Sequence, residues 1–457
     1  MAGLIAALMS AILAFQLNAS MLSPVLKTME KELNTTSAQI GLSQTAFFTS
    51  AALFSLILPR WGDLIGRRKV MIGMVAVTAF GSVLAALSVN VGMLFVARVI
   101  QGVSGPIVPM ALIMLRAQLH DNKRYAFWMA VLASVNGGIG GVDALAGGWL
   151  ADALGFRSVF WTMAVVAVIA VVLVRLGAED TRASEGEPMD WPGSLALVVS
   201  LGTILTAFNE LGKLGAANFV YVGILIAVGV IAFIIFWKIE TAAAHPLVAT
   251  HYMKQRRTWG LLLTTTLIMT GVFAIMNGLV PNLAQSDNFA GLSAGDVSWT
   301  TLTPYALAGL LMGPIAGKLA GKFGYITVLR AGTALTILGV GFALLVVNNP
   351  NAIMLLVLSL WVGISYAGIT NIMLNGLGVV LSPKDNPGYL PGMNSGAFNI
   401  GAGLSFAILF AVNTAVAANM GEVAGYRVSM LVGAAIIALG LLSSFLIPKP
   451  EELPDHM

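Results

Sequence analysis

Two ionisable side chains, Arg98 and Asp143, stand inside long apolar stretches of the sequence. Of the 457 residues 58% are hydrophobic and only 10% are charged, so charges within such stretches are few. A charge inside a bilayer costs several kcal/mol, with values from about 2.5 to above 10, and it persists where a partner or a function holds it. An opposite charge favours an ionised acid, whereas desolvation opposes it. These two residues therefore predict a titratable site that couples protons to transport across a membrane.

Helix geometry predicts that the two side chains lie close together. At about 1.5 Å per residue, Arg98 lies about 8 Å below the outer end of the fourth expected span, and Asp143 about 10 Å below that of the fifth. An ionised Asp143 would bind Arg98, and protonation would release it, which makes a two-state element. The alternative interpretation is a static ion pair that fixes helix packing.

Apolar runs dominate the sequence and predict an all-α integral membrane protein. They reach the roughly 20 residues that a helix needs to cross a bilayer, and they lack the alternation of barrel strands. Dividing the long run at the turn signal of residues 348–351 gives fourteen transmembrane helices. Most Lys and Arg residues then fall in loops on the side of both termini, so the positive-inside rule makes both termini cytoplasmic. We expect a multi-pass protein of the plasma (cell inner) membrane.

The spans are expected to group as six, two and six, with a charged linker before an inserted pair. The loop at 59–68 is echoed at 317–324, which indicates two similar bundles with a site between them. The predicted parts are an N-terminal six-helix bundle at 1–178, a linker, inserted helix hairpin and cytoplasmic connection at 179–257, a C-terminal six-helix bundle at 258–448 and a cytoplasmic tail at 449–457.

The sequence RWGDLIGRRK at Arg60–Lys69 resembles the loop between helices two and three of the major facilitator superfamily. Glycines permit a tight turn, and the acid can cap a helix end and pair with an arginine. The resemblance implies the major facilitator fold and a latch on the cytoplasmic side; a loop that only sets topology is the alternative. The expected gate residues are Gly62, Asp63, Gly66, Arg67 and Arg68.

Two further stretches resemble motifs of this superfamily. Ala97–Pro106 resembles the motif of its proton-coupled members, in which the arginine biases the protonation of a nearby carboxylate; the alternative is an arginine satisfied by backbone carbonyls. Asn136–Trp149 resembles the glycine-rich motif of its antiporters, and small residues let helices approach closely. The Gly-Pro pair of that motif is replaced here by Asp143 and Ala144, which favours symport or uniport.

The inserted hairpin carries the resemblance to one branch of the superfamily. Asp190–Gly193 before the hairpin and His245–Val248 after it are similar to the fourteen-helix drug:proton antiporters. In that branch helix one usually contains an aspartate, whereas residues 15–24 contain no acid here. The resemblance implies drug efflux, and the acid-free helix favours the alternatives to it.

Neutral polar and aromatic residues within the other spans predict an apolar pocket with a few polar handles. Any one of these amides could instead join two helices. Such a pocket suits neutral or singly charged lipophiles, while Arg98 could attract an organic anion. The expected substrate-binding residues are Gln16, Asn18, Gln44, Gln101, Asn136, Phe273, Asn277, Tyr305, Trp361, Asn394 and Phe398.

The leading prediction is a secondary active transporter that exports hydrophobic or amphipathic molecules by proton antiport and alternating access, that is, multidrug efflux. The alternatives are a proton symporter or uniporter for a metabolite or organic anion, and a lipid transporter. Expected partners are a small-molecule substrate, protons and the bilayer, for a monomer that binds no nucleic acid. The chain has no cysteine and four histidines, and it lacks a phosphate-binding Gly-x-x-x-x-Gly-Lys stretch, so we expect no enzyme, catalytic residue, metal or cofactor.

Overall fold

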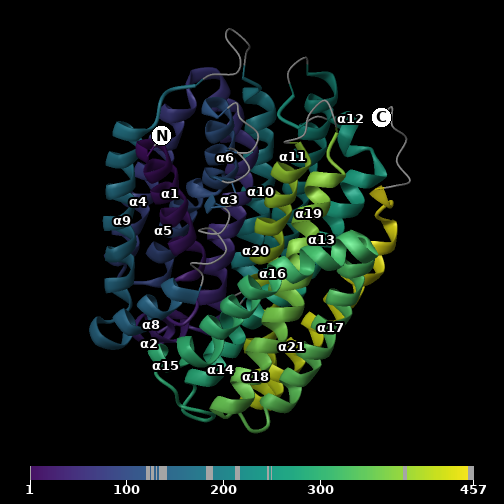
Figure 1. The fold of residues 1–457 in the computed structure, drawn as a ribbon. Helices are drawn as coiled ribbons and strands as arrows, with labels where there is room; N and C mark the ends of the chain where they lie inside the picture. The colour runs from purple at the N-terminus through teal and green to yellow at the C-terminus, as the bar shows by residue number, and fades with distance from the viewer. Residues whose placement is uncertain are drawn as a thin grey trace. The chain divides into compact units, whose positions relative to one another are not determined.

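The computed structural model of the chain consists of helices joined mostly by short connections (Figure 1). It describes residues 2–119, 124, 128–129, 131–132, 141–181, 189–211, 217–243, 246–248, 250–383 and 389–450.

Contacts between residues divide the chain into two units. The first comprises Met1–Leu22, Leu42–Ile139 and Leu154–Thr250, and the second comprises Ser23–Gly41, Gly140–Ala153 and His251–Met457. Two short segments from the first half of the sequence therefore belong to the second unit. The predicted domain boundaries stay a prediction.

Two helices of the first unit begin at asparagine residues that cap their first turn. Asn90 starts α5 because its side-chain oxygen accepts a hydrogen bond from the backbone N–H of Met93 at 2.9 Å, which satisfies one exposed donor of the first turn. Asn218 does the same for α11 through Tyr221. The elements are α1 (Ala2–Ser20), α3 (Ser37–Ile65, which begins in the second unit), α4 (Arg67–Ala86), α5 (Val91–Gln101), η1 (Gly102–Ser104), α6 (Ile107–Gln118), α9 (Phe156–Gly177), α10 (Trp191–Leu211) and α11 (Phe219–Ala242).

The second unit contains helices that widen into π-helical turns at three places. Asn351 caps α18 as Asn90 caps α5, by accepting from the N–H of Met354 at 3.0 Å. The elements are α2 (Leu26–Glu32), α8 (Val142–Leu154), α12 (Thr250–Met253, at the boundary), α13 (Arg256–Ala274), η4 (Ile275–Leu279), α14 (Val280–Gln285), α15 (Ala294–Val297), η5 (Ser298–Leu302), α16 (Thr303–Phe323), α17 (Tyr325–Val346), α18 (Ala352–Val362), η6 (Gly363–Thr370), α19 (Asn371–Val380), α20 (Tyr389–Met420), α21 (Glu422–Ser443) and η7 (Ser444–Leu446).

The prediction of fourteen transmembrane helices is wrong. Among the described residues, 12 helices are long and apolar enough to cross a membrane. Two of the expected spans are missing from that set. One corresponds to α8, whose 13 described residues are fewer than a membrane span needs. The other is α16, whose turns at Lys318 and Lys322 lower its hydrophobicity. The α10–α11 hairpin remains among the 12.

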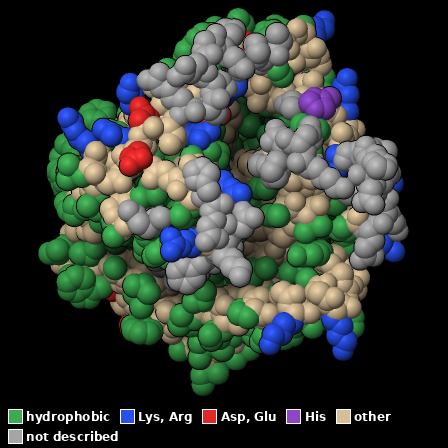
Figure 2. All heavy atoms as spheres, turned by 45° about the horizontal axis from the view of Figure 1, so that its top comes forward, with side chains coloured by type: hydrophobic (Ala, Val, Ile, Leu, Met, Phe, Trp, Pro, Cys, Tyr) green, Lys and Arg blue, Asp and Glu red, His purple; other side chains and the backbone are tan. Residues whose placement is uncertain are grey.

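Apolar side chains on the outside of the helices match a lipid environment. Phe80, Val165 and Ile231 are each about half exposed or more, and α11 is the most hydrophobic of the spans, with only 22% of its residues buried. Hydrophobic side chains cover much of the face in Figure 2, with Lys and Arg side chains scattered among them. Because lipid chains are as apolar as these residues, their exposure costs little in a membrane.

Glycines allow α13 and α21 to approach closely. A Cβ on Gly433 would lie 2.6 Å from the carbonyl oxygen of Gly271, and one on Gly271 would lie 2.6 Å from that of Gly433. The contact is backbone against backbone, so neither helix can yield by changing a rotamer.

We expect Gly433→Leu to destabilise the protein by about 2 kcal/mol or more, because a larger side chain must push these helices apart. The measurement is the fraction of detergent-purified protein that stays monodisperse after heating. Gly341→Leu on α17 is the matched control, since a Cβ there meets nothing within 4 Å. Equal stability of the two variants would contradict the close packing of α13 and α21.

Candidate functional site

A fully buried arginine organises the polar interior of the first unit. Nη1 of Arg98 donates to Oε1 of Gln101 at 2.7 Å, and Nη2 donates to the carbonyl oxygen of Asn18 at 3.0 Å and to Oε1 of Gln44 at 3.1 Å. The guanidinium also lies over the ring of Phe47, 4.2 Å from its centroid, which adds a cation–π contact. Three helices, α1, α3 and α5, thus supply oxygens to one cation.

The three amides around this arginine extend the network. Gln101 donates from Nε2 to the hydroxyl of Ser82 at 3.0 Å, and Asn18 donates from Nδ2 to the carbonyl of Ala14 at 2.8 Å. Oδ1 of Asn18 is buried without a hydrogen-bond partner among the described residues. Asn18, Gln44 and Gln101, all expected in the substrate pocket, are therefore brought together as the shell of a buried charge.

The pairing expected between Arg98 and Asp143 stays a prediction, because these residues belong to different units. Within the described part of its own unit, no carboxylate forms an ion pair with Arg98. The positive charge rests on amide and carbonyl oxygens and on an aromatic face. Taking a cation out of water in this way is costly unless its hydrogen-bonding groups are satisfied.

The loop after α3 is held by an ion pair within its own turn. Nε and Nη2 of Arg67 contact Oδ1 of Asp63 at 2.8 and 2.7 Å, and both side chains are largely shielded from water. Two nitrogens of the guanidinium thus share one carboxylate oxygen, and this charge-assisted contact fixes the geometry of the turn as well as neutralising the charges.

A segment after α9 completes this loop. Gly66 adopts φ of +117°, a conformation that residues with a side chain rarely tolerate. A Cβ at Gly66 would also meet the carboxylate of Asp180, whose Oδ1 accepts from the N–H of Arg68 at 3.2 Å. Gly62 packs against Met110. The predicted gate residues thus lie together, and their role as a gate stays a prediction.

Asp143 is buried in the first turn of α8, within the second unit. Hydrogen bonds fix the backbone on both sides of it. Thr303 donates its hydroxyl to the carbonyl of Gly141 at 2.7 Å, and Ser298 donates to the carbonyl of Ala144 at 2.8 Å. The acid is therefore held on a segment that is bonded to η5 and to the start of α16.

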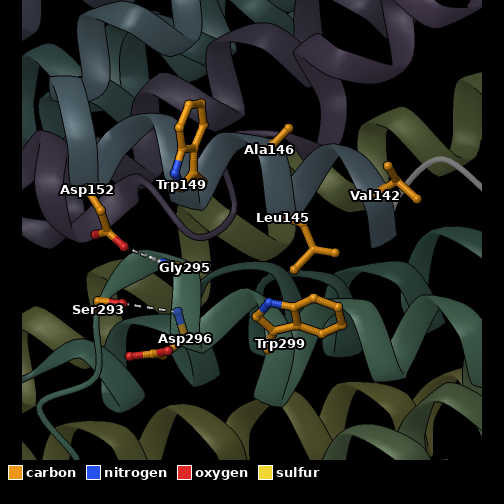
Figure 3. A pocket seen from close by; sticks show the side chains of 9 residues that line it. All are labelled: Val142, Leu145, Ala146, Trp149, Asp152, Ser293, Gly295, Asp296 and Trp299. Carbon is orange, nitrogen blue, oxygen red and sulfur yellow. Dashed lines mark hydrogen bonds between the residues drawn. The ribbon is translucent and has the colours of Figure 1, made fainter.

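The far end of α8 is bonded to the turn that precedes η5 (Figure 3). The two carboxylate oxygens of Asp152 accept from the backbone N–H groups of Ala294 at 3.0 Å and Gly295 at 2.7 Å. Gly148 permits this approach, since a Cβ there would lie 2.5 Å from the carbonyl oxygen of Ala294. Both ends of α8 are thus anchored within the second unit.

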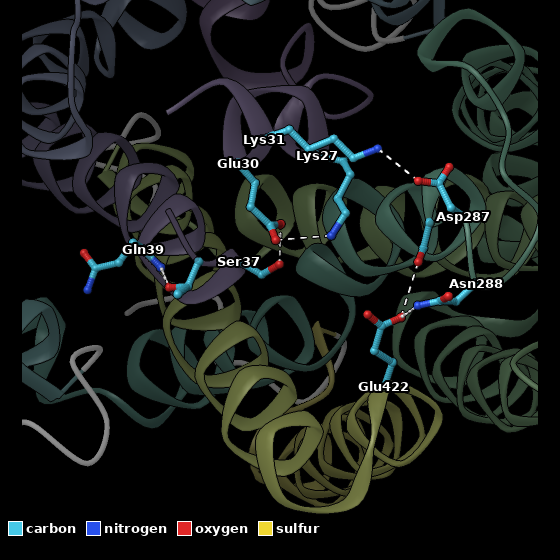
Figure 4. A network of polar contacts seen from close by, with 10 residues as sticks. Lys27, Glu30, Lys31, Ser37, Gln39, Asp287, Asn288 and Glu422 are labelled. Carbon is cyan, nitrogen blue, oxygen red and sulfur yellow. Dashed lines mark hydrogen bonds and ion pairs between the residues drawn. The ribbon is translucent and has the colours of Figure 1, made fainter. Parts of the chain in front are cut away.

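Within the second unit, a polar network connects the segment Ser23–Gly41 to residues from the later part of the chain (Figure 4). Lys31 forms an ion pair with Asp287 at 3.5 Å, but the two side chains are 59% and 84% exposed, so the pair contributes about 0 to 1 kcal/mol. Glu422 accepts from Asn288 at 3.2 Å. A more buried bond runs from Nε2 of Gln285 to the carbonyl of Pro24 at 2.8 Å.

Three π-helical turns, η4, η5 and η6, mark the second unit as a candidate binding region. Such turns are rare and occur frequently at functional sites. Asn277 lies within η4 and Tyr366 within η6. The N–H of Ala274, just before η4, donates to the hydroxyl of Ser405 at 2.8 Å. The widened turn thus has a side-chain partner on α20.

Aromatic rings line the same part of α13 and its neighbours. The rings of Phe273 and Phe406 meet edge to face with centroids 6.0 Å apart, and Phe406 contacts Phe410 at 5.4 Å. Tyr366 donates its hydroxyl to the sulfur of Met269. Met269 and Phe273 lie four residues apart and so share one face of the helix.

Asn277 continues this helix face and carries a carboxamide that is largely buried. Its Nδ2 donates to the carbonyl of Phe273 at 3.1 Å, and its Oδ1 accepts weakly from the hydroxyl of Ser23 at 3.4 Å. Each of these atoms can form one further hydrogen bond. Phe273 and Asn277 are thus two predicted binding residues that lie side by side in the second unit.

Other predicted binding residues have structural partners. Asn394 uses both ends of its amide, accepting from Thr265 at 2.7 Å and donating to the carbonyl of Leu374 at 3.3 Å. Trp361 donates to the carbonyl of Leu335 and stacks on Phe342, packing against α17.

The remaining candidates are scattered. Gln16 donates to the hydroxyl of Ser20 at 3.0 Å. Tyr305 follows η5 on α16 and Phe398 lies on α20; both are partly buried. Asn136 lies outside the described residues.

Sequence reasoning missed the hydroxyl residues that join the helices, namely Ser23, Thr265, Ser298, Thr303 and Ser405. Serine and threonine are so common in apolar helices that their type alone carries little signal. The clustering of Ser298, Thr301 and Thr303 within six residues was the one pattern that could have indicated a contact.

In both units, the groups that could contact a substrate are mainly neutral hydrogen-bonding groups and aromatic rings, with few charged side chains. Groups of His, Asp and Glu able to hold a metal ion are absent from the described residues. A substrate would therefore be recognised by amides, hydroxyls and rings. Such a multi-pass helical protein, with isolated charges buried in apolar spans, is a membrane transporter by class.

Sequence comparison identifies the family. Residues 8–406 match the Major Facilitator Superfamily, and the chain belongs to it. It is 52% identical over 455 residues to the uridine/deoxyuridine transporter of Lactococcus lactis subsp. cremoris (strain MG1363), covering 98% of this chain and 95% of that protein. It is 28% identical to the multidrug transporter protein MdtP of Bacillus subtilis (strain 168) over 62% of this chain and 53% of that protein.

The fold is shared with solved transporters. The crystal structure of the nucleoside transporter NupG superposes with a TM-score of 0.67 at 14% identity, covering 98% of this chain and 100% of that one. A POT family transporter in complex with 5-aminolevulinic acid superposes with a TM-score of 0.69, also at 14% identity, over 97% and 96% of the two chains. At this identity the likeness concerns the fold alone.

These comparisons correct the predicted function. Multidrug efflux by antiport is wrong, because the relative that matches nearly the whole chain at 52% identity is a uridine/deoxyuridine transporter. The drug transporter matches at lower identity and over a shorter stretch. The alternative interpretation, a metabolite transporter, fits better. Membership of the fourteen-helix drug:proton branch is not shown by these comparisons.

Proposed function

We propose that this protein transports pyrimidine nucleosides of the uridine and deoxyuridine class across a membrane. The observation that carries this proposal is the 52% identity, over 98% of the chain, to a transporter named for these two substrates. Alternating access, in which a central site opens to one side of the membrane and then to the other, is the mode of action proposed for it.

The chemistry of the second unit supports a nucleoside. The edge of a uracil base presents a carbonyl, an N–H and a second carbonyl, which a carboxamide can match with one donor and one acceptor. Asn277 offers such a group beside the ring of Phe273, which could stack on the base. On α20, Asn399 is 7% exposed, and its side chain makes no hydrogen bond with the described residues. Its carboxamide is available for a ribose hydroxyl or the base.

Proton coupling through Asp143 is part of the proposal. The acid is 3% exposed and lies on α8, which is bonded to η5 and α16 on both sides of it. A change in its charge would therefore act on a segment whose contacts involve two helices. Arg98 would bias that charge if the two side chains meet in one of the transport states.

We also propose that the protein acts as a monomer in the plasma membrane with both termini in the cytoplasm. The positive charges of the loop at Arg67, Arg68 and Lys69, with those at Arg256 and Arg257, support this orientation, because basic loops are retained inside.

Uptake of radiolabelled uridine into proteoliposomes that contain the purified protein tests the proposal. Unlabelled deoxyuridine is expected to compete about as well as uridine, whereas free uracil, ribose and the lipophilic cation ethidium should compete poorly. Protein-free liposomes give the background. Failure to move any pyrimidine nucleoside, together with transport of ethidium, would refute the proposal.

Asn277→Ala is expected to raise the KM for uridine about 5- to 50-fold, because a carboxamide lost from the base edge costs about 1–2.3 kcal/mol. The measurement is initial uptake rate against uridine concentration. Ser23→Ala is the matched control, since it removes the internal bond to Asn277 at 3.4 Å and leaves the carboxamide in place. If both variants raise KM equally, Asn277 positions a helix and does not bind the substrate.

A further inference from the structure

A cavity of about 590 Å³ lies between α8 and the α15–η5 turn of the second unit (Figure 3). Its volume falls within the range of roughly 300–1,000 Å³ common for small-molecule sites. Its position sets it apart from the predicted binding residues, because none of them lines it. The lining residues are Val142, Leu145, Ala146, Trp149, Asp152, Ser293, Gly295, Asp296 and Trp299.

One part of the cavity wall is apolar and faces outward. Trp149 and Trp299 are 65% and 64% exposed, and Val142 is 63% exposed. On a multi-pass membrane protein, such surfaces meet lipid, and exposed tryptophans concentrate at the level of the lipid headgroups. The cavity therefore opens at the boundary between acyl chains and headgroups.

The other part of the wall is acidic. Asp152 is held by the N–H groups of Ala294 and Gly295, which orient its carboxylate without supplying a cation. Asp296 is exposed, and its carboxylate makes no hydrogen bond or ion pair with the described residues. No Lys, Arg or His is among the nine lining residues. The site thus presents two negative charges beside an apolar wall.

We propose that this cavity binds a phospholipid with a primary-amine headgroup, with the ammonium at Asp296 and an acyl chain along Trp299 and Leu145. Three features select this ligand. The negative charges require a cationic group, and the indole ring of Trp299 favours a cation near its face. The outward-facing apolar wall requires a lipid rather than a soluble amine. A carboxylate accepts charge-assisted hydrogen bonds from an ammonium N–H, which a quaternary choline group cannot donate.

Native mass spectrometry of the full-length protein in detergent tests the proposal with three palmitoyl-oleoyl lipids at equal concentration. These are phosphatidylethanolamine, phosphatidylcholine and phosphatidylglycerol. We expect phosphatidylethanolamine to bind about fivefold more tightly than either of the others, since an exposed charge-assisted hydrogen bond, which neither choline nor glycerol can donate as a cation, contributes about that much. Equal binding of the three lipids, or of the ethanolamine and choline lipids, would overturn the proposal.

Variants assign the selectivity to the cavity. Asp296→Asn should reduce phosphatidylethanolamine binding to the level of phosphatidylcholine, while Trp299→Ala should weaken the binding of all three lipids because it removes the apolar wall. Asp287→Asn is the matched control, because Asp287 is a carboxylate nearby in sequence that is 84% exposed and outside the cavity. A preference for phosphatidylethanolamine that survives Asp296→Asn, or that disappears in Asp287→Asn, contradicts the assignment. All three side chains are exposed, so each variant should melt at the wild-type temperature. The proposal is independent of nucleoside transport.

Discussion

Arg98→Ala is expected to abolish uridine transport and to destabilise the protein by about 3–5 kcal/mol. The change strands Oε1 of Gln101, Oε1 of Gln44 and the carbonyl of Asn18, which are buried oxygens that now accept from the guanidinium. A buried acceptor left without its donor costs about 1–3 kcal/mol, and breaking a buried charged network costs about 3–5. Thermal stability in detergent and uridine uptake in proteoliposomes are the two measurements.

Arg157→Ala is the control within the same unit. Arg157 donates to the carbonyl of Ser88 at 2.9 Å, and its guanidinium lies over the ring of Phe156, so we expect a smaller loss of stability and normal transport. Arg98→Lys keeps the charge, but a single ammonium cannot reproduce the planar fork that serves three oxygens. Near-normal stability and uptake in Arg98→Ala would show that these oxygens find other donors.

Sequence patterns predicted much of the fold because the bilayer constrains it strongly. Most of the long uncharged runs form helices long and apolar enough to cross a membrane. Arg98 is fully buried, as the apolar residues around it in the sequence indicated. The count of fourteen was wrong where two weak segments, α8 and α16, were taken as full spans. One is too short as described, and the other carries two lysines. Sequence identifies a transmembrane span reliably only when the apolar segment is clearly longer and more hydrophobic than a helix needs to cross the bilayer.

The grouping of amides could not be read from the sequence. Asn18, Gln44 and Gln101 were expected to bind substrate, and that role stays a prediction. The side chains of Gln44 and Gln101 accept from Arg98 because the rotation of α3 and α5 about their axes turns them toward it, and Asn18 contributes its backbone carbonyl. Apolar residues surround a membrane helix on most sides, so hydrophobic periodicity does not fix that rotation. The same limit explains Trp361, which packs on α17 through Leu335.

The prediction of drug substrates was wrong because the motifs on which it depended make local structural contacts and do not report which substrate is bound. Gly66 is needed for its positive φ, and Arg67 and Asp63 form a local ion pair, whichever compound is carried. Residues of this kind persist between drug and metabolite transporters of one fold, whereas substrate choice depends on a few amides and rings. Phe273 and Asn277 were predicted from their residue types, and their role stays a prediction. The π-helical turn that holds Asn277 has no sequence signature.

In the mechanism that we propose, a proton gradient drives transport through Asp143, and the hydrogen bonds around this residue supply the coupling. The hydroxyls of Thr303 and Ser298 hold α8 at the carbonyls on either side of the acid. An ionised Asp143 in this buried setting is costly, whereas the protonated acid is tolerated far better. Protonation therefore favours the arrangement in which α8 stays bonded to η5 and α16. Loss of the proton favours an arrangement that offers the carboxylate water or a cation.

Asp143→Asn keeps the shape of the protonated acid and removes its titration, so it should uncouple transport from protons. We expect uridine accumulation driven by a pH gradient to fall about tenfold or more, toward the level without a gradient. Exchange of internal for external uridine at equal pH should stay within about threefold of wild type, because exchange needs no change of protonation. Asp296→Asn, which changes an exposed acid, should leave both activities unchanged. A parallel loss of exchange would assign Asp143 to helix packing, and unchanged accumulation would place proton coupling elsewhere or make the protein a uniporter.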